Sequence, residues 1–130
     1  MNPQPLNILH VEDDADIRLV AGMAMALDPA MTVTSVESGG AALRMLAEGA
    51  FRPDLLLLDV MMPDMDGMRL VAGARRLPGM EAVPAIFLTA RTRPGDIALY
   101  RAAGSLGLII KPFDPVTLAQ QIRALLPDPV

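Results

Sequence analysis

Hydrophobic residues in this chain follow two alternating patterns. Short, nearly continuous apolar runs are typical of strands that are covered on both faces. Between them lie longer stretches in which apolar residues recur every three or four positions, as they do along one side of a helix. The clearest run is Leu-Leu-Leu-Leu at residues 55–58. The runs predict five strands, at residues 6–11, 32–36, 55–58, 84–88 and 106–110.

The intervening stretches predict five helices. Pro94 and Gly104 suit the start and end of the fourth helix, and Asp114 before Pro115 is typical of a capped helix start for the fifth. The second helix is expected to end before Pro53, the third to cover residues 68–77, and the fourth residues 94–103. The expected buried stripes are Ile17, Val20, Met23, Ala24 and Leu27 in the first helix; Leu43, Leu46 and Ala47 in the second; Leu70, Val71 and Ala74 in the third; and Leu118, Ile122 and Leu125 in the fifth.

This alternation of strands and helices predicts an α/β fold of three layers. A parallel sheet must be covered by helices on both of its faces, because each strand returns through a helix. We expect one domain over residues 1–130, with a core from about residue 5 to 126. Only four residues follow Leu126, so no output domain is expected.

Composition limits the classes of function. The 130 residues are 52% hydrophobic but only 3% aromatic, so the core must be aliphatic, and the absence of cysteine excludes disulfides and thiolate metal sites. The net charge is −4 without a block of Lys or Arg, which argues against direct nucleic-acid binding. No apolar run approaches the ~20 residues of a membrane span, so we expect no membrane insertion and a cytoplasmic location.

Polar residues follow four of the five predicted strands at the point where each strand ends. Glu12 and Asp13 follow the first strand, Asp59 the third, Thr89 the fourth and Lys111 the fifth. Ligands of parallel sheets bind beyond the carboxyl ends of the strands, so these side chains are expected to share one pocket. Lys111 is the only lysine beside ten arginines, which suggests a site that needs a compact point charge.

These residue types together predict a pocket that accepts a phosphoryl group. Crowded carboxylates repel one another unless a hard cation lies between them, and an oxygen-only set suits Mg²⁺. Asp59 could then attack phosphorus, while Lys111 and Thr89 bind the oxygens of the transferred group. Individual acidic residues have simpler interpretations as turn formers or helix caps. That interpretation is open for Asp14 and Asp16, and either Asp64 or Asp66 is expected to cap the third helix.

With these residues in place, the sequence resembles the response-regulator receiver domains of two-component signalling. Four segments at the strand ends carry the resemblance: ILHVEDD at residues 8–14, LLDVMMPDMDG at 57–67, FLTA at 87–90 and IIKPF at 109–113. The resemblance covers essentially the whole chain. It implies a flavodoxin-like sheet with the strand order 2-1-3-4-5, and a signalling module rather than an enzyme acting on other substrates.

The resemblance also implies roles for individual residues. Asp59 would be the phospho-acceptor, supplied by a histidine kinase or a phosphotransfer protein, and phosphorylation would switch the binding of a downstream effector protein. Thr89 would turn its hydroxyl toward the phosphoryl group, and Lys111 would pair with a phosphoryl oxygen. The Lys111–Pro112 bond would be cis. The implied Mg²⁺ ligands are Asp13, Asp59, the backbone carbonyl of Met61 and, through water, Glu12.

The sequence departs from this family at one position and is distinctive at two more. The family usually has an aromatic residue three positions before the lysine, where this chain has Leu108. Tyr100, the single tyrosine, is expected to be a packing residue of the fourth helix. Met61 and Arg91 lie where the family tunes loss of phosphate, and neither is a good general base, so we expect slow loss. His10 is expected to be a packed strand residue.

Two other functions compete with this interpretation. A phosphotransferase of the haloacid-dehalogenase type also uses an aspartate after a strand, but needs a second one two residues on, where this chain has Met61. A degenerate receiver that acts only as a scaffold is favoured by Leu108 and disfavoured by the complete acidic set. A dinucleotide site is disfavoured, because no Gly-x-Gly-x-x-Gly follows the first strand. The chain is expected to be a monomer or a weak dimer.

Overall fold

Strands and helices alternate along the chain in the computed structural model, which describes residues 4–127. The strands are β1 (Leu6–Val11), β2 (Met31–Val36), β3 (Leu55–Asp59), β4 (Ala85–Thr89) and β5 (Gly107–Ile110). The helices are α1 (Ala15–Met25), α2 (Gly39–Glu48), α3 (Gly67–Arg75), α4 (Pro94–Ala102) and α5 (Leu118–Leu125). The predicted α/β alternation is therefore confirmed.

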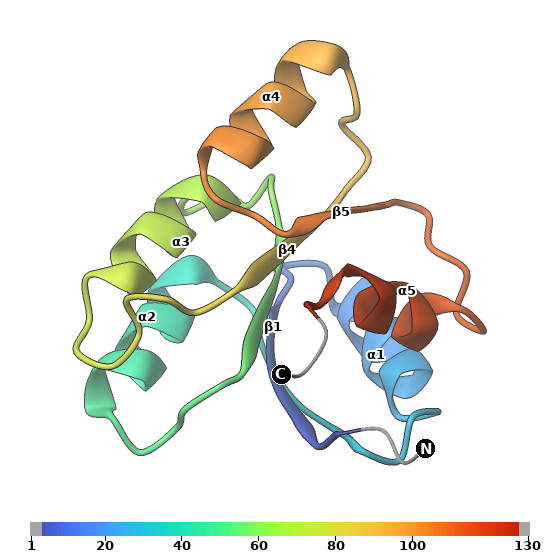
Figure 1. The fold of residues 1–130 in the computed structure, drawn as a ribbon, viewed down its shortest axis with the longest axis horizontal. Helices are drawn as coiled ribbons and strands as arrows, with labels where there is room; N and C mark the ends of the chain where they lie inside the picture. The colour runs from blue at the N-terminus through green and yellow to red at the C-terminus, as the bar shows by residue number, and fades with distance from the viewer. Residues whose placement is uncertain (1–3, 128–130) are drawn as a thin grey trace.

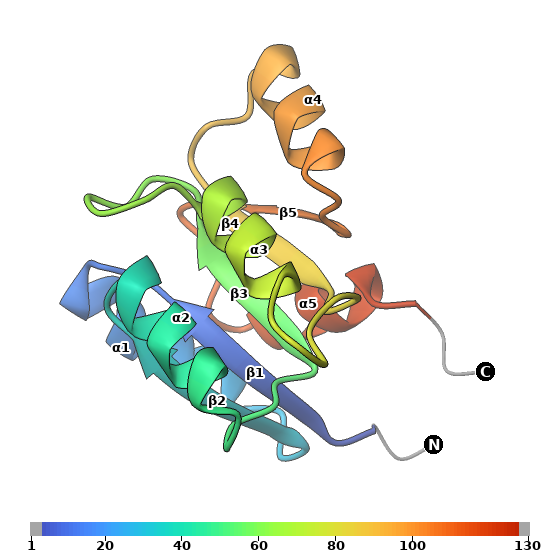
Figure 2. The ribbon, with the colours of Figure 1, turned by 90° about the vertical axis from the view of Figure 1, so that its left-hand side faces the viewer.

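All neighbouring strands are parallel, and the sheet has the order β2-β1-β3-β4-β5, as the resemblance implied. Helices α1 and α5 cover one face of the sheet, while α2, α3 and α4 lie on the other (Figures 1 and 2). In the register, Val11 lies opposite Leu58, and Asp59 opposite Leu88. The carboxyl ends of the central strands therefore lie side by side at one edge of the sheet.

Each face of the sheet has its own aliphatic core. Strands β3 and β4 are buried along their whole length, which explains their unbroken apolar sequences. Alternate residues of one strand supply the two cores, because successive side chains point to opposite faces. The core under α2, α3 and α4 includes Leu9, Leu56, Leu58, Leu70 and Phe87. The core under α1 and α5 includes Ile8, Leu57, Ile86, Leu118 and Ile122.

The predicted buried stripe of α1 was wrong in part. Val20, Met23 and Leu27 are exposed. Ala24 is buried as predicted, and the helix also buries Ala21 and Met25. The helix carries apolar residues of its own on nearly every face, so their spacing alone could not identify the face that points inward. A smaller error occurs in α2, where Ala47 is exposed and Gly39, Ala42 and Leu46 are buried. The stripe predicted for α3 is confirmed.

The start predicted for the fifth helix was also wrong. Residues 115–117 form a turn, and α5 begins at Leu118. The Asp114 carboxylate accepts a hydrogen bond from the Val116 amide at 2.9 Å, so it closes this turn rather than capping the helix. Asp-Pro is equally typical of a turn and of a helix start, which explains the error. Among the described residues, no helix is both long enough and apolar enough to cross a membrane.

Candidate functional site

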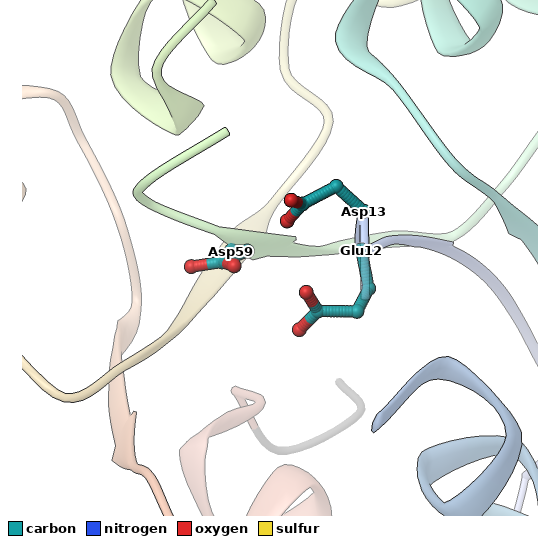
Figure 3. Close-up of side chains that lie close together, drawn as sticks. All are labelled: Glu12, Asp13 and Asp59. Carbon is teal, nitrogen blue, oxygen red and sulfur yellow. The ribbon is translucent and has the colours of Figure 1, made fainter. Parts of the chain in front are cut away.

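Three carboxylates meet at the carboxyl edge of the sheet. Glu12 and Asp13 directly follow β1, and Asp59 is the last residue of the neighbouring strand β3. One oxygen of each carboxylate lies within 4.8 Å of the others, so the predicted convergence is confirmed for these residues. Figure 3 shows the side chains of Asp13 and Glu12 extending from the end of β1 toward Asp59. Glu12 and Asp59 are buried, whereas Asp13 is exposed.

Lys111 brings a positive charge into this group from the end of β5. Its Nζ lies 2.6 Å from Glu12 Oε1 and 3.1 Å from Asp59 Oδ2. From the end of β5 the lysine thus reaches past β4 to the ends of the neighbouring strands β3 and β1. The Lys111–Pro112 peptide bond is cis, as expected.

Burial and charge shift the titration of this cluster. Burial raises the pKa of Glu12 above its ordinary value, although the hydrogen bond from Lys111 acts in the opposite direction. Burial alone would lower the pKa of Lys111. Its hydrogen bonds to Glu12 and Asp59 outweigh that effect, so the pKa of Lys111 lies above its ordinary value. Lys111 is therefore held as a cation at neutral pH.

Thr89 and Met61 border the acidic group. Thr89 is the last residue of β4 and is buried, and its Oγ1 accepts a hydrogen bond from the Arg91 amide at 2.9 Å. The Met61 amide donates to Asp59 Oδ1 at 3.1 Å, which places this backbone beside the carboxylate. The Met61 side chain is 52% exposed and contributes no acid–base group. The Met61 amide and Lys111 thus give each oxygen of Asp59 one hydrogen-bond donor.

The sequence interpretation missed two residues that support the site. Arg18 Nη1 donates to the carbonyl oxygen of Glu12 at 2.8 Å, which fixes the loop that bears the acidic pair. Asp64 accepts hydrogen bonds from the amides of Gly39 and Gly40, at 3.3 and 2.9 Å, and so ties the loop after β3 to the start of α2. Helical side chains lean toward the helix N-terminus, and that rule could have suggested the Arg18 contact.

Asp14 and Asp66 have local capping roles of the kind that the sequence left open. Asp14 caps α1 by accepting from the amides of Asp16 and Ile17, and Asp66 caps α3 by accepting from Arg69. Asp66 is therefore the cap of the third helix, and Asp64 is not.

Oxygen ligands dominate this pocket, as a hard divalent cation requires. Glu12, Asp13 and Asp59 supply carboxylate oxygens, and the described residues offer neither histidine nor cysteine at this cluster. Three carboxylates against one lysine leave a negative pocket, and a bound cation would balance it. The donor set therefore fits Mg²⁺ and fits a soft or imidazole-preferring metal poorly.

Most of the chain matches a known protein family. Residues 8–123 match the family described as response regulator receiver domain. The chain is 40% identical over 120 residues to the transcriptional regulatory protein CseB of Streptomyces avermitilis, covering 92% of this chain and 48% of that protein. It is 36% identical over 118 residues to a 14.6 kDa protein of Leptolyngbya boryana, covering 91% of this chain and 88% of that one. The chain spans about half the length of the two CseB proteins that it matches.

Solved structures agree with these sequence matches. The chemotaxis response regulator CheY4 of Vibrio cholerae superimposes with a TM-score of 0.81 at 29% sequence identity. That alignment covers 93% of this chain and 98% of CheY4. The beryllofluoride-activated receiver domain of DrrB shares the fold, with a TM-score of 0.75 at 21% identity. On the family match over residues 8–123, the chain belongs to the response regulator receiver domains of two-component signalling.

Proposed function

We propose that this domain accepts a phosphoryl group on Asp59 and uses the modified residue to switch the binding of a protein effector. The observation that carries the proposal is the contact of Lys111 with both Asp59 and Glu12 beside Asp13. A carboxylate that faces a fixed cation and two further acidic side chains has the surroundings that phosphoryl transfer needs. Membership of the receiver family supports the same assignment.

In this proposal, the donor is a phosphohistidine of a histidine kinase or of a phosphotransfer protein. An oxygen of Asp59 attacks phosphorus, a P–O bond forms, and the P–N bond to the donor imidazole breaks with its electron pair passing to nitrogen. Lys111 then pairs with a phosphoryl oxygen, since its Nζ already lies 3.1 Å from Asp59 Oδ2. The Thr89 hydroxyl donates to another of these oxygens and so registers that the site is phosphorylated.

The residues that would hold Mg²⁺ are Asp13, Asp59 and the backbone carbonyl of Met61, with Glu12 acting through water. When bound, the cation would neutralise charge on the phosphoryl oxygens during transfer. Glu12 is suited to an indirect role, because its Oε1 already accepts from Lys111 at 2.6 Å. Arg18 keeps the acidic loop in place by binding the carbonyl of Glu12.

We place this exchange in the cytoplasm, and the effector is expected to be a protein rather than nucleic acid. Relatives such as MtrA of Mycobacterium tuberculosis, 34% identical, are described as DNA-binding response regulators, and this chain spans 53% of that protein. With a net charge of −4, this chain offers little electrostatic attraction to a phosphate backbone.

The decisive experiment is incubation with a small phosphodonor and Mg²⁺, followed by mass spectrometry of the intact protein. We expect the mass to rise by one phosphoryl group in the wild type, and hydroxylamine to remove that group as it does from an acyl phosphate. Asp59→Asn should stay unmodified. A matched control is Asp96→Asn, which changes a half-buried carboxylate in the first turn of α4 and should be modified like the wild type.

Two results would contradict the proposal. One is a wild type that remains unmodified although circular dichroism shows it to be folded. The other is a phosphoryl group that persists in Asp59→Asn, which would move the acceptor to another residue. A mass increase lost equally in Asp59→Asn and Asp96→Asn would point to misfolding rather than to a specific acceptor.

A further inference from the structure

A buried hydroxyl of α4 is bound to the turn that follows β4. Tyr100 is 3% exposed, and its ring packs against Phe87 with 5.4 Å between the ring centroids. Its hydroxyl donates a hydrogen bond to the backbone carbonyl of Arg91 at 2.8 Å. A buried phenol hydroxyl needs such a partner, so this contact fixes Tyr100 and the turn relative to each other.

The same backbone residue is bound to Thr89 from its other side. The Arg91 amide donates to Thr89 Oγ1 at 2.9 Å, while the Arg91 carbonyl accepts from Tyr100. The Arg91 side chain is exposed, and the two bonds use only its backbone groups. One peptide segment therefore connects the hydroxyl at the end of β4 with the hydroxyl inside α4.

This connection limits how Thr89 can respond to a phosphoryl group. A threonine side chain occupies a few discrete rotamers, so turning its hydroxyl toward Asp59 is a step rather than a gradual shift. After that step the Arg91 amide no longer has Thr89 Oγ1 as its acceptor, and the turn is released. Because Tyr100 is buried, its hydroxyl must then follow the Arg91 carbonyl or lose its hydrogen bond.

We propose that Tyr100 is a positioning residue for Thr89, and that it links the Asp59 pocket to helix α4. Its hydroxyl holds the Arg91 backbone where the Arg91 amide binds Thr89 Oγ1, and so opposes the turn of Thr89 toward Asp59. The inference rests on the proposed function, because Thr89 responds only if Asp59 carries a phosphoryl group or its analogue. In this arrangement an aromatic residue of α4 responds to the state of the pocket. In β5, Leu108 stands where the family usually has an aromatic residue.

The first test measures binding of beryllofluoride, an analogue of the phosphoryl group, in the presence of Mg²⁺. Tyr100→Phe keeps the ring against Phe87 and removes only the hydroxyl. Losing one hydrogen bond from the arrangement that opposes binding should tighten the apparent affinity by about fivefold. Unchanged or weaker binding by a folded Tyr100→Phe variant would overturn the inference.

A double-mutant comparison separates this role from simple packing. Thr89→Val preserves the shape of the side chain but removes the hydroxyl that Tyr100 is proposed to position. In that background, adding Tyr100→Phe should leave the affinity for beryllofluoride unchanged. If Tyr100→Phe tightens binding equally with and without the Thr89 hydroxyl, Tyr100 does not act through Thr89 and the inference fails.

The second test uses the chain's own fluorescence. The sequence contains one tyrosine and no tryptophan, so tyrosine emission reports on Tyr100 alone. We expect beryllofluoride with Mg²⁺ to change this emission in the wild type and to leave it unchanged in Asp59→Asn. Binding detected by fluorine NMR with a silent Tyr100 would overturn this inference and leave the proposed function standing. No binding in the wild type would overturn both.

Discussion

At the scale of single residues, His10 shows how a polar side chain is accommodated inside β1. It is fully buried, and its Nδ1 lies 3.3 Å from Ser35 Oγ on the neighbouring strand. Its Nε2 has no hydrogen-bond partner within residues 4–127. Burial, together with the charges of Lys111 and Arg18, lowers the pKa of His10 from 6.5 to about 4. The prediction of a packed strand residue is confirmed, and at neutral pH the ring is uncharged.

This shift predicts that acid destabilises the fold already above the ordinary pKa of a carboxylate. The unfolded chain takes up a proton at His10 as the pH falls through 6.5, whereas the folded chain does so only near 4. The contribution of the uncharged His10 ring to the free energy of unfolding is therefore present in full above pH 6.5 and declines below it. Urea unfolding without added Mg²⁺ should show a loss of roughly 2 kcal/mol between pH 7 and pH 5.

The matched variant for this experiment is His10→Val, which cannot titrate. Its free energy of unfolding should show no such decline over the same interval, because the raised pKa of Glu12 acts in the opposite direction as the pH falls. An equally steep decline in His10→Val would assign the acid sensitivity to another group.

Phosphoryl lifetime also depends on single residues. Met61 has an exposed side chain that accepts hydrogen bonds only weakly, and the guanidinium of Arg91 offers donors but no acceptor. Neither can orient and deprotonate water beside Asp59, so the phosphoryl group should decay slowly. Met61→Asn introduces a carbonyl and an amide at the mouth of the pocket and should speed the decay several-fold. The decay is followed by mass spectrometry after the phosphodonor is removed, and equal rates for both proteins would contradict the prediction.

At the scale of elements, the loop from β3 into α3 leaves no room for a side chain at Gly67. A Cβ there would lie 2.6 Å from the carbonyl oxygen of Asp59 and 3.2 Å from Phe87 Cε1. The Gly67 amide also donates to Val60 O at 2.9 Å, so the loop cannot move away without losing this bond. Gly67→Ala should therefore cost about 2 kcal/mol of unfolding free energy.

A glycine in α1 offers the control for this loop. Apart from its chain neighbours and the backbone of its own helix, no atom lies within 4 Å of the Cβ position of Gly22, and alanine is the better helix former. Gly22→Ala should stabilise the domain by about 1 kcal/mol. Thermal melts of both variants measure the difference, and a Gly67→Ala protein as stable as Gly22→Ala would show that the loop can relax around the added methyl group.

Sequence patterns predicted the strands more accurately than the helix faces, and α1 shows why. A strand buried on both sides needs only a continuous apolar run, as in β3. A helix requires a choice of face, and α1 carries apolar residues on several faces. Its inward face is the one on which Ala21, Ala24 and Met25 pack into the core against the sheet, and no local pattern encodes that choice. The α5 boundary failed for a related reason, since the turn at residues 115–117 is held by Asp114.

At the scale of the whole molecule, topology is what makes the site predictable. Strand ends that are distant in sequence meet at one edge because all connections are parallel, so Glu12, Asp13, Asp59 and Lys111 could be grouped without coordinates. Alternation alone predicted the layers, whereas the strand order came from the family resemblance. The link from Thr89 to Tyr100 was not predictable, because it depends on the path of the backbone at Arg91.

The acidic pocket also affects the stability of the whole fold. Folding brings Asp59 close to the consecutive residues Glu12 and Asp13, from which it is distant in the unfolded chain, so the repulsion between them opposes folding. A cation that binds only the folded pocket relieves this repulsion and adds its binding free energy to stability. At ten times its dissociation constant, Mg²⁺ should contribute roughly 1.4 kcal/mol, which corresponds to about 5 °C in melting temperature for a domain of this size.

Asp13→Asn makes this prediction specific to the pocket. Asp13 is the exposed member of the acidic cluster, so its replacement should disturb packing little. Removing its charge lowers the repulsion, so the variant should melt at a higher temperature than the wild type when Mg²⁺ is absent. It should also respond less to added Mg²⁺, because one ligand has been lost. Sodium chloride at matched ionic strength controls for general screening, which acts on both proteins. If sodium chloride reproduces the shift, or if both proteins respond equally to Mg²⁺, then Asp13 does not bind the ion and the Mg²⁺ site proposed here is wrong.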